Sequence, residues 1–342
     1  MMRAAASTLA RSWPTAGWTA ARALAIASSG GIGGLESSDS YRPRRALLYM
    51  PADNERKVSK AAREIDVDVV CIDCEDAVAL TQKEAARNKV AEYLATMDFG
   101  RSERAVRINS LSSGVAEADL EAVLRGPVLP DAIVIPKVDS AADLHHIVAM
   151  ILDLAAQHPA GEPIKLITMC ESAYGLLHLR EVLEAAAGLG LLGGAGAALR
   201  LEAAILGGDD FAASVGATRS AGSRELLFAR QCFLTHCHAY GIQPIDIVQI
   251  NYKDDELLAT EAADGSAMGF EGKQVIHPRQ VPIVQAHFSP SEAVVAAAEE
   301  LVAAFRAHQA TGAGTFVFKG QMIDNPTMLQ ARNVLARANT GS

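Results

Sequence analysis

The chain has 342 residues, of which 50% are hydrophobic and 21% are charged, a composition that supports a substantial core and excludes disorder as its main feature. Its 31 Lys and Arg against 40 Asp and Glu leave a net charge of −9, which argues against binding to nucleic acid. Five cysteines in such a length indicate no disulfide framework and favour a reducing compartment. The longest uncharged stretch of the body, residues 185–199, is too short for a membrane span, so we expect no membrane partner.

Residues 1–40 are predicted to be a leader that does not belong to the fold. Arg3, Arg11 and Arg22 lie in this segment, which is rich in Ala, Ser and Thr and has no acidic residue before Glu36. Such a composition is typical of a mitochondrial transit peptide, and a disordered tail without a targeting role is the alternative. We therefore predict a mitochondrial protein.

From residue 44 onward, short apolar runs alternate with longer Ala-rich stretches of helical character. This alternation predicts parallel strands that are buried on both faces. The units repeat about every 33 residues, which predicts a (β/α)8 TIM barrel over residues 44–288. A doubly wound sheet is the alternative and needs only five or six strands. The runs that we predict as strands are 46–50, 68–73, 105–109, 132–137, 165–171, 203–210, 242–248 and 273–278.

Residues 289–342 lie outside the repeating units. Their pattern predicts a C-terminal helical and extended extension of the barrel. Within it we expect a helix over 292–308, an extended segment over 316–318 and a second helix over 326–338.

Two carboxylates follow neighbouring strands of the predicted barrel. Glu171 ends the fifth run and Asp210 ends the sixth, and a TIM barrel forms its active site at the carboxyl ends of the strands. Two carboxylates without a nearby Cys–His cluster suit a hard divalent cation such as Mg²⁺. Gly207 and Gly208 allow the backbone to approach a ligand there. An ordinary pair of loop carboxylates is the alternative.

Cations also lie near the predicted strand ends. The guanidinium of Arg107 is suited to binding a substrate carboxylate or polarising a carbonyl, and an ion pair with Glu75 or Asp76 is the alternative. Lys137 can act as a Schiff-base lysine, although its acidic neighbours favour a salt bridge.

Three basic residues after the first strand have helical spacing. Arg56, Lys60 and Arg63 recur at i, i+4 and i+7, which places them on one face of a helix near the barrel mouth. They can bind the phosphate groups of a ligand, and a solvated helix face is the alternative.

The motifs together, in this order, resemble those of the citrate lyase β-subunit-like family. The resemblance covers roughly residues 44–335, and any single motif is weak without the others. The motifs are Leu48-Tyr49-Met50-Pro51, Asp73-Cys74-Glu75-Asp76, Val106-Arg107-Ile108-Asn109, Pro136-Lys137, Glu171-Ser172-Ala173-Tyr174-Gly175, Gly207-Gly208-Asp209-Asp210-Phe211 and Gly272-Lys273-Gln274-Val275-Ile276-His277-Pro278.

This resemblance implies a Mg²⁺-dependent barrel enzyme that acts on acyl-CoA thioesters, usually as a homotrimer. It implies Glu171 and Asp210 as the metal ligands. It also implies a catalytic Asp324 in the C-terminal extension, which in relatives can cover the barrel of a neighbouring subunit. Arg107 is implied as the second catalytic residue. The residues implied to contact substrate and CoA are Tyr49, Arg56, Lys60, Arg107, Ile276 and His277.

The expected reaction is cleavage of the carbon–carbon bond of (S)-citramalyl-CoA to give pyruvate and acetyl-CoA, with weak malate synthase activity in the condensing direction. Cleavage of malyl-CoA or methylmalyl-CoA is the alternative within the same family. Outside it, the alternatives are an aldolase that acts through Lys137 and a non-catalytic barrel that binds CoA.

Overall fold

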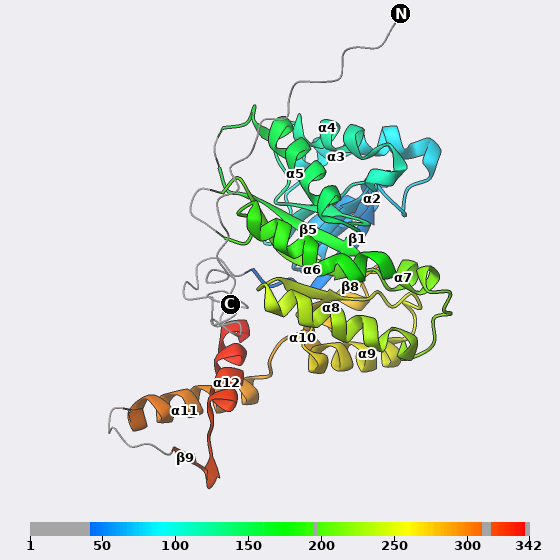
Figure 1. Ribbon diagram of the computed structural model, residues 1–342. Coiled ribbons are helices and arrows are strands. Elements are labelled where there is room, and N and C mark those ends of the chain that lie inside the picture. Colours follow the sequence, from blue (N-terminus) through cyan, green and yellow to red (C-terminus); the bar gives the residue numbers. More distant parts are fainter. Residues whose placement is uncertain (1–41, 160, 194–196, 310–315, 339–342) are drawn as a thin grey trace, which may run out of the picture.

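The structure is a computed structural model that describes residues 42–159, 161–193, 197–309 and 316–338 (Figure 1). The predicted leader, residues 1–40, lies outside the described residues. Eight parallel strands form a closed barrel in the order β1 to β8, which confirms the predicted TIM barrel. The strands are β1 (Ala46–Pro51), β2 (Val69–Asp73), β3 (Glu103–Arg107), β4 (Ala132–Ile135), β5 (Ile164–Cys170), β6 (Leu199–Leu206), β7 (Gln243–Asp246) and β8 (Gly272–Val275).

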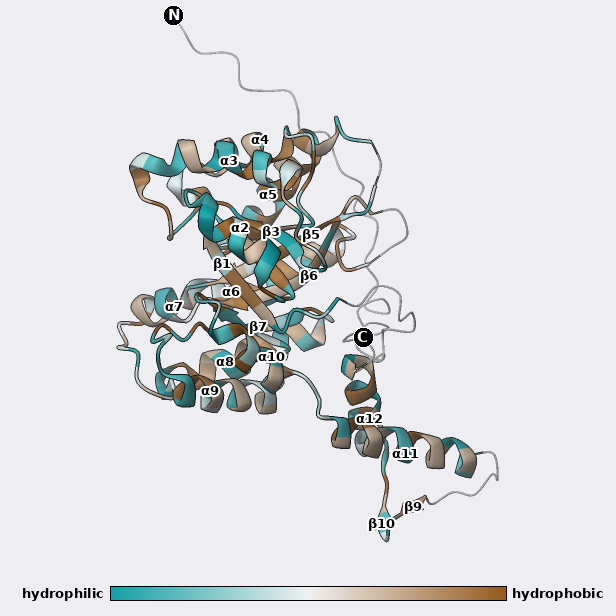
Figure 2. Cartoon of the chain, turned by 180° about the vertical axis from the view of Figure 1, so that it is seen from behind, coloured by the Kyte–Doolittle hydropathy of each residue, from teal (hydrophilic) through white to brown (hydrophobic). Residues whose placement is uncertain are grey.

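Helices follow the strands and form the outer layer of the barrel (Figures 1 and 2). Within the described ranges, no helix combines the length and apolar character needed to cross a membrane. Short 3₁₀ turns lie at 80–82, 111–113 and 224–226. The helices of the barrel are α2 (Glu55–Glu64), α3 (Lys83–Thr96), α4 (Ala116–Leu124), α5 (Ala141–Ala155), α6 (Ala173–Gly188), α7 (Gly208–Ser214), α8 (Leu227–Ala239), α9 (Asp255–Met268) and α10 (Gln280–Phe288).

The inside of the barrel is filled by apolar side chains from alternate strand positions. These residues form a cluster separate from the larger apolar layer between strands and helices. On β2, Val69 and Cys71 belong to the inner cluster, and the next position in the same alternation is Asp73. On β3, Ala105 is followed in the same way by Arg107. The alternation that builds the apolar interior therefore ends in charged groups at the barrel mouth.

The opposite end of the barrel is closed by a buried polar network. Arg44, which is 2% exposed, donates to Glu103 at 2.7 Å, to Gln243 at 2.6 Å and to Glu202 at 2.7 Å. A Cβ atom on Gly272 would lie 1.9 Å from the carbonyl oxygen of Arg44, so only glycine fits there. The chemistry of this barrel is therefore expected at the carboxyl ends of the strands.

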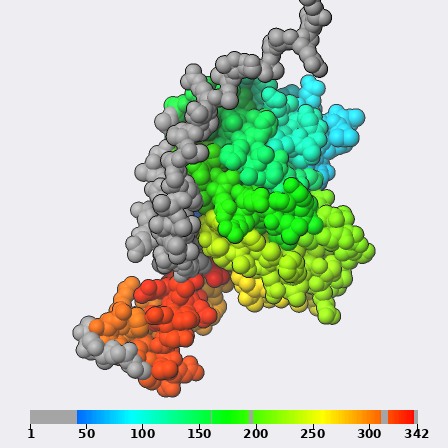
Figure 3. All heavy atoms as spheres, viewed as in Figure 1, coloured from blue at the N-terminus to red at the C-terminus, as the bar shows by residue number. Residues whose placement is uncertain are grey.

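Beyond the barrel, the C-terminal segment forms an arm. It consists of α11 (Glu292–Gln309), the hairpin of β9 (Val317–Phe318) with β10 (Gln321–Met322), and α12 (Asn325–Ala338). The two helices pack on each other through a small apolar cluster. The arm projects from the barrel body (Figures 1 and 3). Both helices and the extended segment agree with the sequence expectation to within about two residues at each end, whereas β10 was not predicted.

Candidate active site

Glu171 lies at the barrel mouth, directly after β5. Its side chain is almost fully buried, and the backbone N–H of Lys137 donates to its Oε2 at 3.0 Å. A Cβ atom on Gly207 would lie 2.6 Å from both Cγ and Oε1 of Glu171. The glycine after β6 is therefore what allows the carboxylate to approach that strand end.

Asp210 does not end a strand, and the predicted strand over 203–210 is wrong at its end. β6 stops at Leu206, and α7 begins at Gly208, so that Asp210 is the third residue of a helix. Acidic residues are stabilised in the first turn of a helix by the helix dipole, and this turn holds both Asp209 and Asp210. Asp210 nevertheless remains at the mouth, since Lys137 contacts it.

Lys137 connects the acidic groups of the mouth. Its Nζ lies 3.0 Å from Oε1 of Glu75 and 3.8 Å from Oδ2 of Asp210. Its backbone φ is 53°, a left-handed conformation that is unfavourable for a lysine and is found mainly where function requires it. The salt bridge that the acidic neighbours of this lysine favoured in the sequence is present.

The carboxylates repel one another at this position. Burial, together with the charges of Glu75 and Asp210, raises the pKa of Glu171 to about 8, while Lys137 opposes the shift. No cluster of three potential metal ligands occurs among the described residues. Mg²⁺ commonly takes only one or two protein carboxylates and completes its shell with water and substrate oxygens. Glu171 and Asp210 therefore fit a Mg²⁺ site of that kind.

Arg107 is held rigidly beside these acids. Its Nε and Nη2 donate to the two carboxylate oxygens of Asp73 at 2.7 and 2.6 Å, and its Nη1 lies 2.9 Å from Glu75. The guanidinium carbon also lies 4.6 Å from the ring centre of Tyr49. The ion pairs with Glu75 and Asp76 that were the alternative for this arginine are present.

The main partner of Arg107 is Asp73, which the sequence analysis named only within a motif and did not predict as a partner of this arginine. Asp73 and Arg107 are paired in register across β2 and β3, and both side chains continue the inward alternation of their strands. An acid and an arginine at equivalent ends of consecutive strands were the signal that could have shown the pair.

Tyr49 forms the next part of the mouth. Its hydroxyl donates to Oε1 of Gln274 at 3.1 Å, and Nε2 of Gln274 donates to the carbonyl oxygens of Leu206 and Asp246 at 3.0 Å. Burial raises the pKa of Tyr49 well above its usual range, so the phenol stays protonated. Gln274, which the sequence did not single out, thus ties the strand ends of β1, β6 and β7 together.

The implied CoA-contacting residues lie on neighbouring parts of the rim. Arg56 and Lys60 are exposed on α2, whose N-terminus follows β1. Ile276, which is 39% exposed, and His277 follow β8, and His277 stacks on Tyr252 with ring centres 4.6 Å apart. Because β1 pairs with β8, the two segments emerge from adjacent strands.

Asp324 is separated from the barrel mouth within one chain. It is exposed on the arm at the start of α12, where its Oδ1 accepts from the backbone N–H of Thr327 at 3.0 Å and from the Thr327 hydroxyl at 2.7 Å. These hydrogen bonds lower the pKa of Asp324 below its usual value. Figures 1 and 2 show that α12, which begins directly after Asp324, belongs to an arm that projects from the barrel body.

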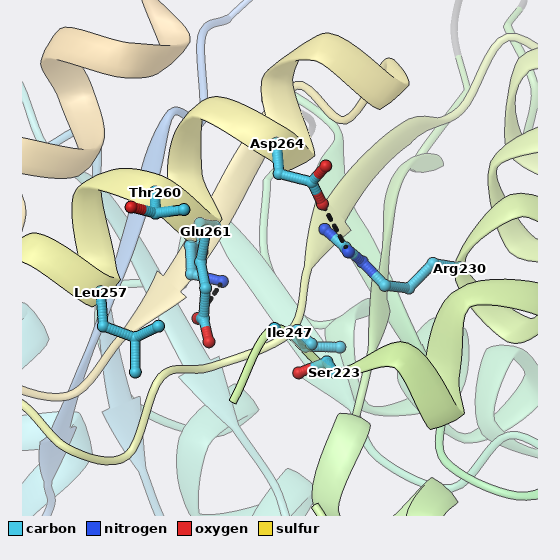
Figure 4. Close-up of a pocket in the computed structure, with 9 residues that line it drawn as sticks. Ser223, Arg230, Ile247, Leu257, Thr260, Glu261 and Asp264 are labelled. Atoms are coloured by element: carbon cyan, nitrogen blue, oxygen red, sulfur yellow. Dashed lines mark hydrogen bonds and ion pairs between the residues drawn. The ribbon is translucent and has the colours of Figure 1, made fainter. Parts of the chain in front are cut away.

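A cavity of about 240 Å³ lies elsewhere, in the layer between the barrel wall and the helices α8 and α9 (Figure 4). Arg230 from α8 and Asp264 from α9 meet across it at 2.9 Å, and Glu261 and Lys273 form a second ion pair there at 3.4 Å. It includes none of the predicted site residues. The structure therefore separates a charged mouth from this buried ionic network.

The fold and the site define a barrel enzyme with acidic and cationic groups at the carboxyl ends of its strands. Residues 45–278 match the model of the HpcH/HpaI aldolase/citrate lyase family. The chain is 42% identical to human mitochondrial citramalyl-CoA lyase and 41% identical to that of rat, in each case over 89% of this chain and 88% of the relative. A structure of protein CitE from Mycobacterium tuberculosis in complex with magnesium, acetoacetate and coenzyme A is 31% identical, with a TM-score of 0.65, and covers 87% of this chain and 98% of that one.

The chain therefore belongs to the HpcH/HpaI aldolase/citrate lyase family. Within that family it is a lyase that acts on CoA esters.

Proposed function

We propose that this protein cleaves (S)-citramalyl-CoA to pyruvate and acetyl-CoA in a Mg²⁺-dependent reaction. The observation that carries the proposal is the meeting of Glu171, Asp210 and Arg107 at one barrel mouth, since these groups match the charges that the reaction develops. The 42% identity to human mitochondrial citramalyl-CoA lyase supports the choice of substrate. The mitochondrial location of these relatives likewise supports the predicted location of this chain.

The reaction breaks the bond between the tertiary carbon that bears the hydroxyl group and the carbon next to the thioester. The hydroxyl proton passes to water at the mouth, the tertiary carbon becomes the ketone carbon of pyruvate, and the electron pair of the broken bond moves into a thioester enolate. Protonation of the enolate then leaves no net change in protons. When bound by Glu171 and Asp210, Mg²⁺ supplies Lewis-acid stabilisation for the oxygens of the pyruvate half.

Side chains of the protein stabilise and protonate the enolate. Arg107 stabilises the enolate oxygen, and its two-point contact with Asp73 fixes the orientation of the guanidinium before substrate arrives. The carboxylate of Asp324, whose pKa is low in the exposed arm, removes the proton of acetyl-CoA in the condensing direction. In the cleavage direction it gives that proton to the enolate, which requires Asp324 to be protonated where it meets the barrel that it serves. Arg56 and Lys60 on the rim bind phosphate groups of CoA.

Because one chain separates Asp324 from the mouth, we propose that the arm serves the barrel of a neighbouring subunit in a homotrimer. The arm packs mainly within itself, and it exposes Val317 and Met322, which are 59% and 74% exposed. Large exposed apolar side chains on a projecting element are typical of a surface that contacts another chain.

Malyl-CoA and methylmalyl-CoA are the alternative substrates, and they differ from citramalyl-CoA in the methyl groups they carry. One methyl group in a pocket is worth only about 1–3 kcal/mol, so selectivity among the three is limited. A non-catalytic barrel is disfavoured, because holding Glu171 in a buried, charged cluster has a cost that mere CoA binding does not require.

The substrate is tested by measuring acetyl-CoA release from the three thioesters, each with and without Mg²⁺. We expect the highest kcat/KM for (S)-citramalyl-CoA, about 10-fold or more above malyl-CoA, and loss of activity in EDTA that added Mg²⁺ restores. Equal or better turnover of malyl-CoA contradicts the proposed substrate, and full activity in EDTA contradicts the metal. If borohydride traps a covalent adduct of substrate with Lys137 in the presence of EDTA, the protein is instead an aldolase that acts through a Schiff base on Lys137.

A further inference from the structure

Gly207 and Gly208, the two glycines before Asp209, each allow a charged side chain to pack against the backbone at the start of α7. Gly207 allows Glu171 to approach β6, as described above. A Cβ atom on Gly208 would lie 2.8 Å from Nη1 of Arg219 and 2.8 Å from Ile247. The first residue of α7 is therefore packed directly under the guanidinium of Arg219.

Arg219 joins three segments that meet behind α7. Its Nη1 donates to Oδ1 of Asp209 on α7 at 3.0 Å, and its Nη2 donates to Oγ of Ser223 at 3.2 Å and to the carbonyl oxygen of Val248 at 3.4 Å. Ser223 adopts a left-handed φ of 50° and is 2% exposed, so the loop that carries it is fixed in place. Ser223 also lines the cavity shown in Figure 4.

A helix as short as α7, with seven residues, has little stability of its own. Its position at the mouth depends on contacts such as the ion pair between Asp209 and Arg219, which is partly shielded from solvent. Asp210 is the next residue after Asp209, so the same contact sets where the Asp210 carboxylate points.

We infer that Arg219 is a positioning residue for Asp210: through Asp209 it holds α7 in the orientation that the metal site requires. This inference rests on the proposed metal site. Arg219 itself touches neither Glu171 nor the reacting atoms. Its loss is expected to weaken metal binding without removing a ligand.

The test measures binding of Mn²⁺ alone to the full-length protein by titration calorimetry. Arg219→Met is expected to raise the Kd for Mn²⁺ about 10-fold, as is typical when a partner that orients a metal ligand is lost. Arg219→Lys keeps a cation beside Asp209 but loses the several N–H donors of the guanidinium group. We therefore expect a Kd for Mn²⁺ between those of the wild type and Arg219→Met. Arg180→Met is the control, because it removes an exposed ion pair with Glu184 on α6 and should leave the Kd unchanged.

A double-mutant cycle with Asp209→Ala tests the route of the effect. If Arg219 acts through Asp209, the double variant binds Mn²⁺ no more weakly than Arg219→Met alone, whereas independent effects multiply. The inference is contradicted if the Kd changes of the two single variants multiply in the double variant, or if Arg219→Met leaves the Kd for Mn²⁺ unchanged. Thermal melting of each variant checks that the barrel is folded.

Glu171→Gln in the same titration separates the inference from the function on which it depends. Lost binding in Glu171→Gln together with unchanged binding in Arg219→Met contradicts only the role of Arg219. Unchanged binding in Glu171→Gln contradicts the metal site itself, and the inference falls with it.

Discussion

Glu171→Gln is expected to lower kcat/KM by about 10³-fold or more, because loss of Lewis-acid stabilisation amounts to several kcal/mol. Glutamine keeps the shape of the side chain and an oxygen that can accept from the backbone N–H of Lys137, so the barrel should stay folded. The measurement is acetyl-CoA release at saturating Mg²⁺, with a melting curve for each variant.

Glu181→Gln provides the matched control. It makes the same change at an exposed position of α6 and should leave kcat/KM unchanged. A Glu171→Gln variant that keeps its turnover shows that this carboxylate is not needed for the reaction.

Asp324→Asn is expected to lose most of kcat, about 10²-fold or more, while it keeps its affinity for Mn²⁺ and CoA. Asparagine still accepts from the backbone N–H of Thr327 and caps α12, so the arm should be preserved. The loss then reports on the proton that Asp324 delivers. Asp98→Asn is the control, since that exposed acid also accepts from a nearby backbone N–H, that of Gly100 at 2.8 Å, but lies between α3 and β3.

Mixing the two inactive variants tests whether the arm acts between chains. Oligomers formed from equal amounts of Glu171→Gln and Asp324→Asn chains have half of their barrels and half of their arms intact. If each arm serves a neighbouring barrel, about a quarter of wild-type activity returns. If each arm serves its own barrel, every site keeps one defect and no activity returns, which contradicts the proposed arrangement.

The sequence predicted the barrel because each structural unit is locally consistent. Short apolar runs buried on both faces alternate with helices at a regular spacing, and these two patterns together define few topologies. The position of Glu171 followed from the same logic, since it comes directly after a strand of continuous apolar character.

The sequence could not give the details that depend on contacts between distant segments. The apolar pattern predicted a strand up to residue 210, but β6 ends at Leu206, directly before Gly207 and Gly208. Asp210 therefore lies in the helix α7 and not in a strand. The pairing of Asp73 with Arg107 depends on the register between β2 and β3. The position of Ser223 depends on the left-handed backbone conformation of its loop. Asp324 was predicted only through a resemblance, because the role proposed for it depends on a second chain that no local pattern describes.

The most direct measurement of the central claim is the location of the bound metal in crystals grown with Mn²⁺ and pyruvate, found by anomalous scattering. Mn²⁺ prefers the same oxygen ligands as Mg²⁺ and is visible by this method. We expect one strong peak between the carboxylates of Glu171 and Asp210, with pyruvate oxygens beside it, and no such peak in Glu171→Gln crystals. A peak bound by other residues, or Glu171 and Asp210 turned away from the metal, contradicts the account.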